Sequence, residues 1–187
     1  MKITGSKLLL RIEAAVLLLA MLAQPITFAT AAFGQTAPDF RVAGWIISQD
    51  EHGCRMTNGY DNGQGLEVRL DHRLGEAAII LVDPSFKSLV EGKKYSLDIT
   101  FQAGKTLRDG FEDVTFMPLV GASANAVAAR MEAYEVLPAL ARNGSIIILR
   151  GNAFVAKLSL KGSAEAVQAL KHCAHAVAKV NPSDPLE

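Results

Sequence analysis

Apolar and polar residues alternate in several short stretches of this chain, and each such stretch predicts a strand with one buried face. The alternation is clearest over residues 66–70 and 95–101. Residues 78–82 are apolar throughout, which is typical of a central strand, and Asp83-Pro84 ends that run. Residues 58–65 are rich in Asn, Asp and Gly, so we expect a hairpin turn there. Further strands are expected at residues 45–47, 54–56 and 114–119.

A helix is predicted in the middle of the chain, beginning near Ser123, a residue type that caps helices well. Its apolar stripe would be formed by residues three to four positions apart, namely Val127, Met131 and Tyr134. Pro138 cannot donate a hydrogen bond to the preceding turn. We therefore expect the helix either to kink at this proline or to restart after it.

The last third of the chain predicts a hairpin followed by a second helix. Residues 145–149 and 154–160 form the two expected strands, and Gly162-Ser163 is expected to cap the helix. One face of this helix is apolar and carries Ala166, Val167, Leu170, Cys173, Ala174 and Val177.

This order of elements predicts an α+β domain with a largely antiparallel sheet of about six to eight short strands, a middle helix and a C-terminal helix. The domain is expected to span residues 41–180. A flexible lead-in over residues 32–40 would precede it, and a disordered tail over residues 181–187 would follow it.

The first 31 residues have the layout of a secretory signal peptide. Three basic residues precede an uncharged apolar run over residues 14–23, Pro25 breaks the run, and Ala29-Thr30-Ala31 offers a cleavage site. A membrane anchor is the alternative, but this run is about half the roughly 20 residues that a spanning helix needs. We favour cleavage near Ala31, with Ala32 as an alternative, and a periplasmic or secreted protein without a transmembrane anchor.

The charge balance of the chain argues against nucleic acid as a partner. The full chain has 19 basic and 19 acidic residues, and cleavage after residue 31 would leave 16 and 18, a net charge of −2. Such a chain lacks the excess positive charge with which proteins bind nucleic acid. The expected partner is an envelope or host protein, and the oligomeric state is left open.

Cys54 and Cys173 are the two cysteines of the chain. An exported protein meets an oxidising compartment, where two cysteines are expected to form a disulfide. The bond would attach the apolar face of the last helix to an early strand and would close a loop of about 120 residues, a constraint of roughly 4–5 kcal/mol.

Three of the four histidines flank these cysteines, namely His52, His172 and His175. If the cysteines meet, the imidazoles could share a zinc or copper ion, or a histidine cluster could respond to falling pH. Neither a CxxC pair nor an HExxH motif supports a metal site, and exposed histidines are the ordinary alternative. We favour that alternative and predict no cofactor.

Motifs of common enzyme classes are incomplete. Residues 121–125 resemble GxSxG but lack the final glycine, and Ser123 is better explained as a helix cap. Gly104-Lys105-Thr106 resembles the end of a phosphate-binding loop, but the required earlier glycine is replaced by Ile99. No catalytic residue is therefore assigned from the sequence.

The segment Leu158–Ala166 with Leu170 and Cys173 downstream, together with Trp45 followed by Cys54, resembles small exported proteins of alphaproteobacteria of the invasion-associated locus B kind. In that group a final strand leads through a glycine into a short last helix. The resemblance implies a periplasmic or surface-associated protein without a known enzymatic centre. The chain departs from the group in having two cysteines, where more are expected.

These observations favour an exported, non-enzymatic binding or envelope-accessory protein. The alternatives are a periplasmic hydrolase whose residues meet only in space and a metal binder that uses the three histidines.

Overall fold

The computed structural model describes residues 39–50, 53–71, 75–119 and 125–180. The predicted signal peptide, its cleavage near Ala31 and the predicted tail over residues 181–187 lie outside these ranges. Residues 32–38 of the predicted lead-in also lie outside these ranges, and Phe40, its last residue, already begins the first strand. In chain order the elements are β1 (Phe40–Val42), β2 (Trp45–Asp50), β3 (Gly53–Gly59), β4 (Gly65–Asp71), β5 (Glu76–Val82), β6 (Tyr95–Ala103), β7 (Thr106–Pro118), β8 (Ala126–Glu132), α2 (Ala133–Arg142), β9 (Ser145–Arg150), β10 (Ala153–Ser159) and α3 (Ser163–Val180).

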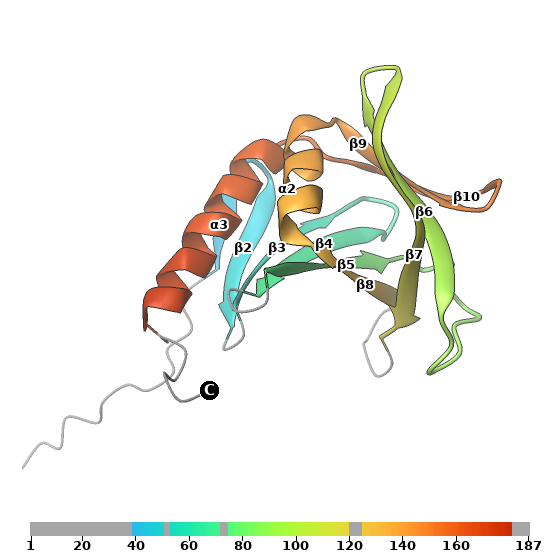
Figure 1. Cartoon of the computed structure of the whole chain (residues 1–187), viewed down its shortest axis with the longest axis horizontal. Helices are drawn as coiled ribbons and strands as arrows, with labels where there is room; N and C mark the ends of the chain where they lie inside the picture. Colours follow the sequence, from blue (N-terminus) through green and yellow to red (C-terminus); the bar gives the residue numbers. More distant parts are fainter. Residues whose placement is uncertain (1–38, 51–52, 72–74, 120–124, 181–187) are drawn as a thin grey trace, which may run out of the picture. The chain divides into compact units, whose positions relative to one another are not determined.

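The strands form one antiparallel sheet in the order β1-β2-β3-β4-β5-β8-β7-β6-β9-β10. The α+β class and the antiparallel sheet are thus confirmed, but the described residues form ten strands, more than the six to eight predicted. The join between β7 and β8 has two pairs, Met117↔Ala128 and Pro118↔Val127. In Figure 1, β6 and β7 run steeply across the page, whereas β5 and β8 run nearly horizontally. The sheet therefore changes direction at this short join.

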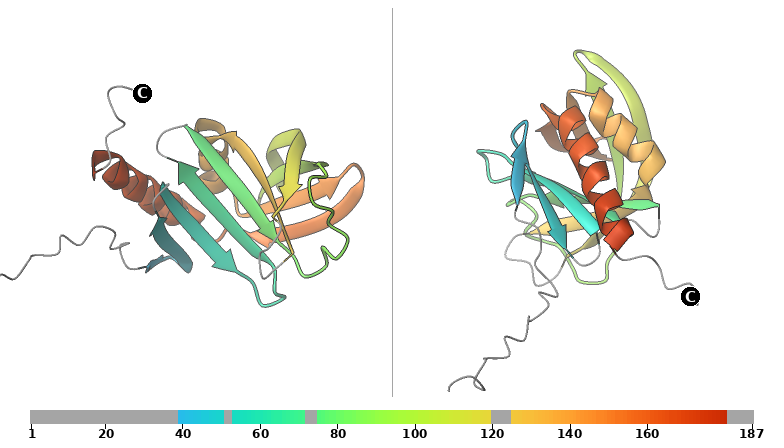
Figure 2. Two further views of the ribbon diagram at one scale, coloured as in Figure 1. Left: turned by 90° about the horizontal axis from the view of Figure 1, so that it is seen from below. Right: turned by 90° about the vertical axis from the view of Figure 1, so that its left-hand side faces the viewer.

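The core lies between one face of the sheet and the two helices. Every second residue of the central strands is buried there, as the sequence alternation predicts: Met56, Val68, Ile79, Ala129 and Phe116. α3 packs mainly on β3 and on α2, and α2 contacts β5 and β8. Figure 2 shows both helices on the same side of the sheet. Trp45 is fully buried, and its indole N–H donates to the carbonyl of Lys161 at 3.0 Å, which ties β2 to the start of α3.

The prediction of a helix beginning near Ser123 is wrong for residues 126–132. Ser123 lies outside the described residues, and Val127 and Met131 belong to β8, which pairs with β5 over seven positions. Pairing with the apolar strand β5 overrides the helical preference of the alanines in this segment. The helix begins at Ala133 instead, runs through Pro138 and leaves Tyr134 72% exposed.

The hairpin and the last helix are found where the sequence predicts them, and the predicted apolar face of α3 packs against the core. α3 begins at Ser163, so the capping position falls on Gly162, and Ser163 makes a contact outside its own helix. Its buried hydroxyl donates to the carbonyl of Leu140 in the last turn of α2 at 2.7 Å, so it joins the two helices. The backbone amide of Ala166 instead donates to the carbonyl of Gly162 at 3.2 Å.

Cys54 on β3 and Cys173 on α3 lie with their sulfurs at bonding distance, and their Cα atoms are 6.0 Å apart. That Cα separation suits a disulfide. The pair is separated by 119 positions in the chain and joins α3 to the strand on which it packs.

Candidate functional site

The structure does not bring the predicted histidine ligands together within the part of the chain it describes. His52 lies outside the described residues. His172 and His175 are exposed on α3, and Cys173 between them is bonded to Cys54. Among the described residues, no group of three or more His, Cys, Asp or Glu side chains is close enough to hold a metal ion.

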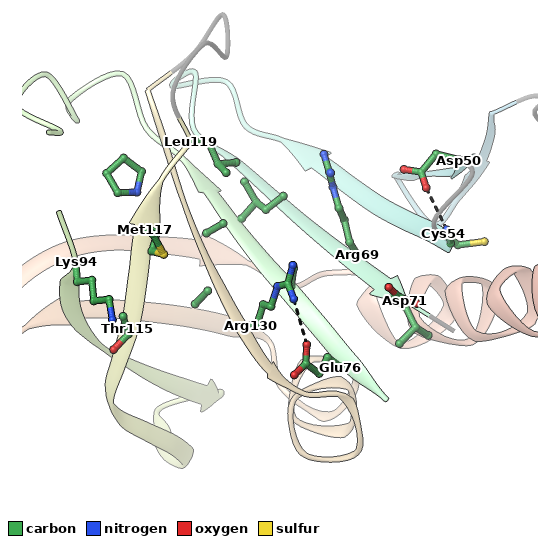
Figure 3. Close-up of a pocket in the computed structure, with 17 residues that line it drawn as sticks. Asp50, Cys54, Arg69, Asp71, Glu76, Lys94, Thr115, Met117, Leu119 and Arg130 are labelled. Carbon is green, nitrogen blue, oxygen red and sulfur yellow. Dashed lines mark hydrogen bonds and ion pairs between the residues drawn. The ribbon is translucent and has the colours of Figure 1, made fainter. Parts of the chain in front are cut away.

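A pocket of about 850 Å³ lies instead on the face of the sheet that the helices leave uncovered. Its floor is formed by side chains of β4, β5 and β8, among them Arg69, Ala78 and Arg130, which alternate along their strands with residues of the core. Its wall comes from the last residues of β7 and from the segments that flank β6 and β8, and includes Lys94 and Met117. Figure 3 shows these side chains around an open hollow, which we call the groove.

Strand register aligns three arginines across the sheet at the groove. Arg55 lies opposite Arg69, Arg69 opposite Ala78, and Ala78 opposite Arg130, across β3, β4, β5 and β8. We call these four residues the basic row; Arg69, Ala78 and Arg130 line the groove, and Arg55 lies beside it on β3. Neighbouring strands lie about 4.8 Å apart, so the backbones of Arg69 and Arg130 are about 10 Å apart. Because Ala78 between them has only a methyl group, space is left between the two long side chains.

Carboxylates partly balance the basic row. Arg69 forms an ion pair with Glu67, and Arg130 forms one with Glu76 at 3.7 Å. The side chains of the two arginines are nevertheless 49% and 74% exposed. A guanidinium has five N–H donors, more than one carboxylate can accept. Both arginines therefore keep donors that can reach a ligand in the groove.

An apolar row lies on one side of the basic row. Ile80, Ala128 and Met117 are aligned across β5, β8 and β7 in the register, and Leu119 follows just beyond β7. Ile80 is 6% exposed, whereas Met117 and Leu119 are 46% and 38% exposed. Exposed apolar side chains beside a concave surface are typical of a binding site.

An acidic row lies on the other side of the basic row. It contains Asp71, Glu76 and Glu132, each two positions along its strand from a member of the basic row. Asp71 and Glu76 line the groove, and Glu132 lies beside it on β8. Glu76 is directly opposite Glu132, and Asp71 is opposite Gly53, whose amide donates to Asp50 at 3.1 Å. Along β5 and β8 the groove thus has an apolar, a basic and an acidic part. Glu67 on β4 lies opposite Ile80 at one end of the apolar row, and Lys94 adds a further cation to the wall.

Two polar residues outside the groove have shifted pKa values that reflect structural contacts. Burial raises the pKa of Tyr60 to about 12, and its hydroxyl donates to the carbonyl of Ser159 at 2.6 Å. Burial by itself would raise the pKa of Asp83, but hydrogen bonds from Ser85 and Gln64 outweigh it and hold the pKa below its usual value. Asp83 thereby fixes the turn that follows β5.

No protein family, no curated protein and no solved structure matches this chain. Within the described residues, neither helix is long and apolar enough to cross a membrane. Evidence about function therefore comes from the residues of the chain itself.

Proposed function

We propose that the protein is exported and acts in the periplasm or outside the cell as a non-catalytic binding protein, with the groove as its binding surface. The observation that carries this proposal is the division of one uncovered hollow into apolar, basic and acidic parts. The apolar row supplies contact area, and a few placed charges fix the orientation of a ligand.

Two observations support export. The basic start, the short apolar run and the Ala29-Thr30-Ala31 site have the order that signal peptidase substrates share. Cys54 and Cys173, at disulfide distance, suit an oxidising compartment outside the cytoplasm.

The arrangement of the charged groups favours binding over hydrolysis. Two of the basic side chains of the groove are held by carboxylates, Arg69 by Glu67 and Arg130 by Glu76. A carboxylate held by a guanidinium is directed at that partner rather than at a ligand, which suits binding through the remaining arginine donors better than proton transfer. Asp71 and Glu76 both line the groove, so hydrolysis by this pair is the alternative function that the experiment must address.

The full chain should be expressed with its own N-terminus and recovered from the periplasm. The intact mass of the mature chain tests cleavage near Ala31. A mass two hydrogens below that of the reduced chain, with no alkyl group added by a thiol reagent, would show the bond between Cys54 and Cys173. An uncleaved chain that stays in the cytoplasm with two alkylatable thiols would contradict export.

Molecules released from the denatured protein should then be compared between wild type and Ala78→Trp. The tryptophan would fill the space between the two arginines, while Ala153→Trp adds the same side chain at the exposed start of β10. We expect a bound molecule that Ala78→Trp loses and Ala153→Trp keeps. Equal amounts in all three proteins, or turnover of an added ester or peptide that Glu76→Gln abolishes, would overturn the proposal.

A further inference from the structure

The basic and acidic rows each place a like charge from beside the groove directly opposite a charge that lines it. Arg55 faces Arg69 across β3 and β4, and Glu76 faces Glu132 across β5 and β8. Directly opposite like charges destabilise a sheet. The ion pairs of Arg69 with Glu67 and of Arg130 with Glu76 offset part of this repulsion. A ligand that carries the opposite charges in the same order would offset more of it.

The spacing of the rows limits what such a ligand can be. Positions i and i+2 of a strand lie about 7 Å apart, so the apolar, basic and acidic rows follow one another at that interval. A ligand that fits all three must carry an apolar chain, then an anion, then a cation. The anion and the cation must be separated by only a short link, because long arginine and glutamate side chains span part of the interval.

We infer that the groove binds a single-chain phospholipid whose phosphate is followed by an ammonium group. This inference rests on the proposed binding function and names its ligand. The phosphate lies over Ala78 and accepts hydrogen bonds from Arg69 and Arg130, since guanidinium groups bind phosphate in a bidentate manner. The ammonium group lies at the acidic row, beside Glu76 and Glu132. The acyl chain lies over Ile80, Ala128 and the exposed side chain of Met117.

Other amphiphiles fit the same surface less completely. A head group with a second anion would meet the carboxylates of the acidic row and be repelled. A neutral head group would leave the donors of Arg69 and Arg130 without a new partner. The apolar part consists of four side chains, Ile80, Ala128, Met117 and Leu119, which offer little contact area for two acyl chains.

The test is native mass spectrometry or calorimetry on the mature chain with three probes, each below its micelle concentration. The probes are lauroyl lysophosphatidylethanolamine, lauroyl lysophosphatidylglycerol, which keeps the phosphate but lacks the ammonium group, and the uncharged lauroyl glycerol. We expect the affinities to fall in that order. Equal affinity for the first two probes would overturn the assignment of the ammonium group, and equal affinity for all three would overturn the whole inference.

Variants then locate the head group. Arg130→Gln should weaken binding of both phospholipid probes by about tenfold, as the loss of a charge-assisted hydrogen bond predicts. Arg150→Gln, an exposed arginine at the end of β9, is its control. Glu132→Gln should weaken only the ethanolamine probe, by about threefold, with Glu112→Gln on the exposed part of β7 as the control. Loss of binding in a control variant, or none in Arg130→Gln, would refute the placement.

Two further outcomes separate this inference from the proposed function. If none of the probes binds, but Ala78→Trp still loses a molecule that copurifies with wild type, the groove binds a different ligand and only the inference fails. If the protein binds bilayer vesicles containing phosphatidylethanolamine but none of the monomeric probes, the groove docks on a membrane and the single-chain ligand is refuted.

Discussion

Reduction of the bond between Cys54 and Cys173 should remove a large part of the stability of this protein. The two residues are 119 positions apart, so the bond closes a loop of nearly the whole described domain. The chain-entropy relation gives about 4.9 kcal/mol for a loop of that length at room temperature. Domains of this size have total unfolding free energies of about 5–15 kcal/mol, so the reduced protein should be marginally stable.

The assay is urea unfolding of the mature chain with and without a thiol-free reductant, followed by tryptophan fluorescence. Trp45 is fully buried and donates to the carbonyl of Lys161, so its emission reports the packing of β2 against α3. With a urea dependence of about 1–3 kcal/mol per molar, the midpoint should fall by about 2 M or more. A Cys54→Ser, Cys173→Ser double variant should match the reduced protein and should not respond to reductant.

A loss below about 1 kcal/mol on full reduction would refute this reasoning. It would mean that the unfolded chain gains little freedom when the bond is broken. Hydrogen exchange of the reduced protein checks that the native packing survives: because the reasoning attributes the loss to the unfolded state, α3 should exchange no faster than the central strands.

Three further substitutions test other parts of the structure. Gly162→Ala should lower the free energy of unfolding in urea by about 2 kcal/mol or more, because Gly162 has a φ of 77° and a neighbouring carbonyl occupies the space of a Cβ. Gly151 is the control, since it has a φ of 57° and open space around it, and Gly151→Ala should cost about 1 kcal/mol. An equal cost for the two variants would contradict the close approach at Gly162. Asp83→Asn should cost about 1–2 kcal/mol at pH 7. Since the pKa of Asp83 is lowered on folding, this stabilisation is present above its unfolded pKa and is lost as the pH falls through the folded value, so the gap between wild type and variant should close in acid. Arg55→Thr should raise stability by a few tenths of a kcal/mol by removing the charge opposite Arg69, and added salt should reduce the gain; a loss that salt does not change would contradict the repulsion.

Local sequence patterns were enough to predict many of the elements. Residues 95–101 alternate and lie in β6, the turn-rich residues 58–65 join β3 to β4, and the apolar stripe ending at Val177 is the buried face of α3. In each case the signal and the structure depend on neighbours within a few residues. The pairing of Cys54 with Cys173 is distant in the chain, but two cysteines leave a single possible partner.

Patterns failed where long-range pairing decided the conformation. Residues 126–132 contain alanines and apolar positions three to four apart, which is typical of a helix, yet seven pairs with β5 hold them in a strand. The groove escaped prediction for the same reason. Arg69 and Arg130 come from strands that become neighbours only through β5, and nothing in the sequence near Arg130 indicates which residues will lie beside it.

The charges in and beside the groove are arranged differently from those of an ordinary solvated sheet face. Such a face usually mixes opposite charges across directly paired positions, because these pairs stabilise the sheet. Here the directly opposed pairs Arg55–Arg69 and Glu76–Glu132 carry like charges, while the favourable pairs are not directly opposed: Arg130–Glu76 is diagonal, and Arg69–Glu67 lies along one strand. A surface arranged for stability alone would exchange one member of each opposed pair. The arrangement instead keeps guanidinium donors and carboxylates in separate rows, as the proposed binding of a zwitterion requires.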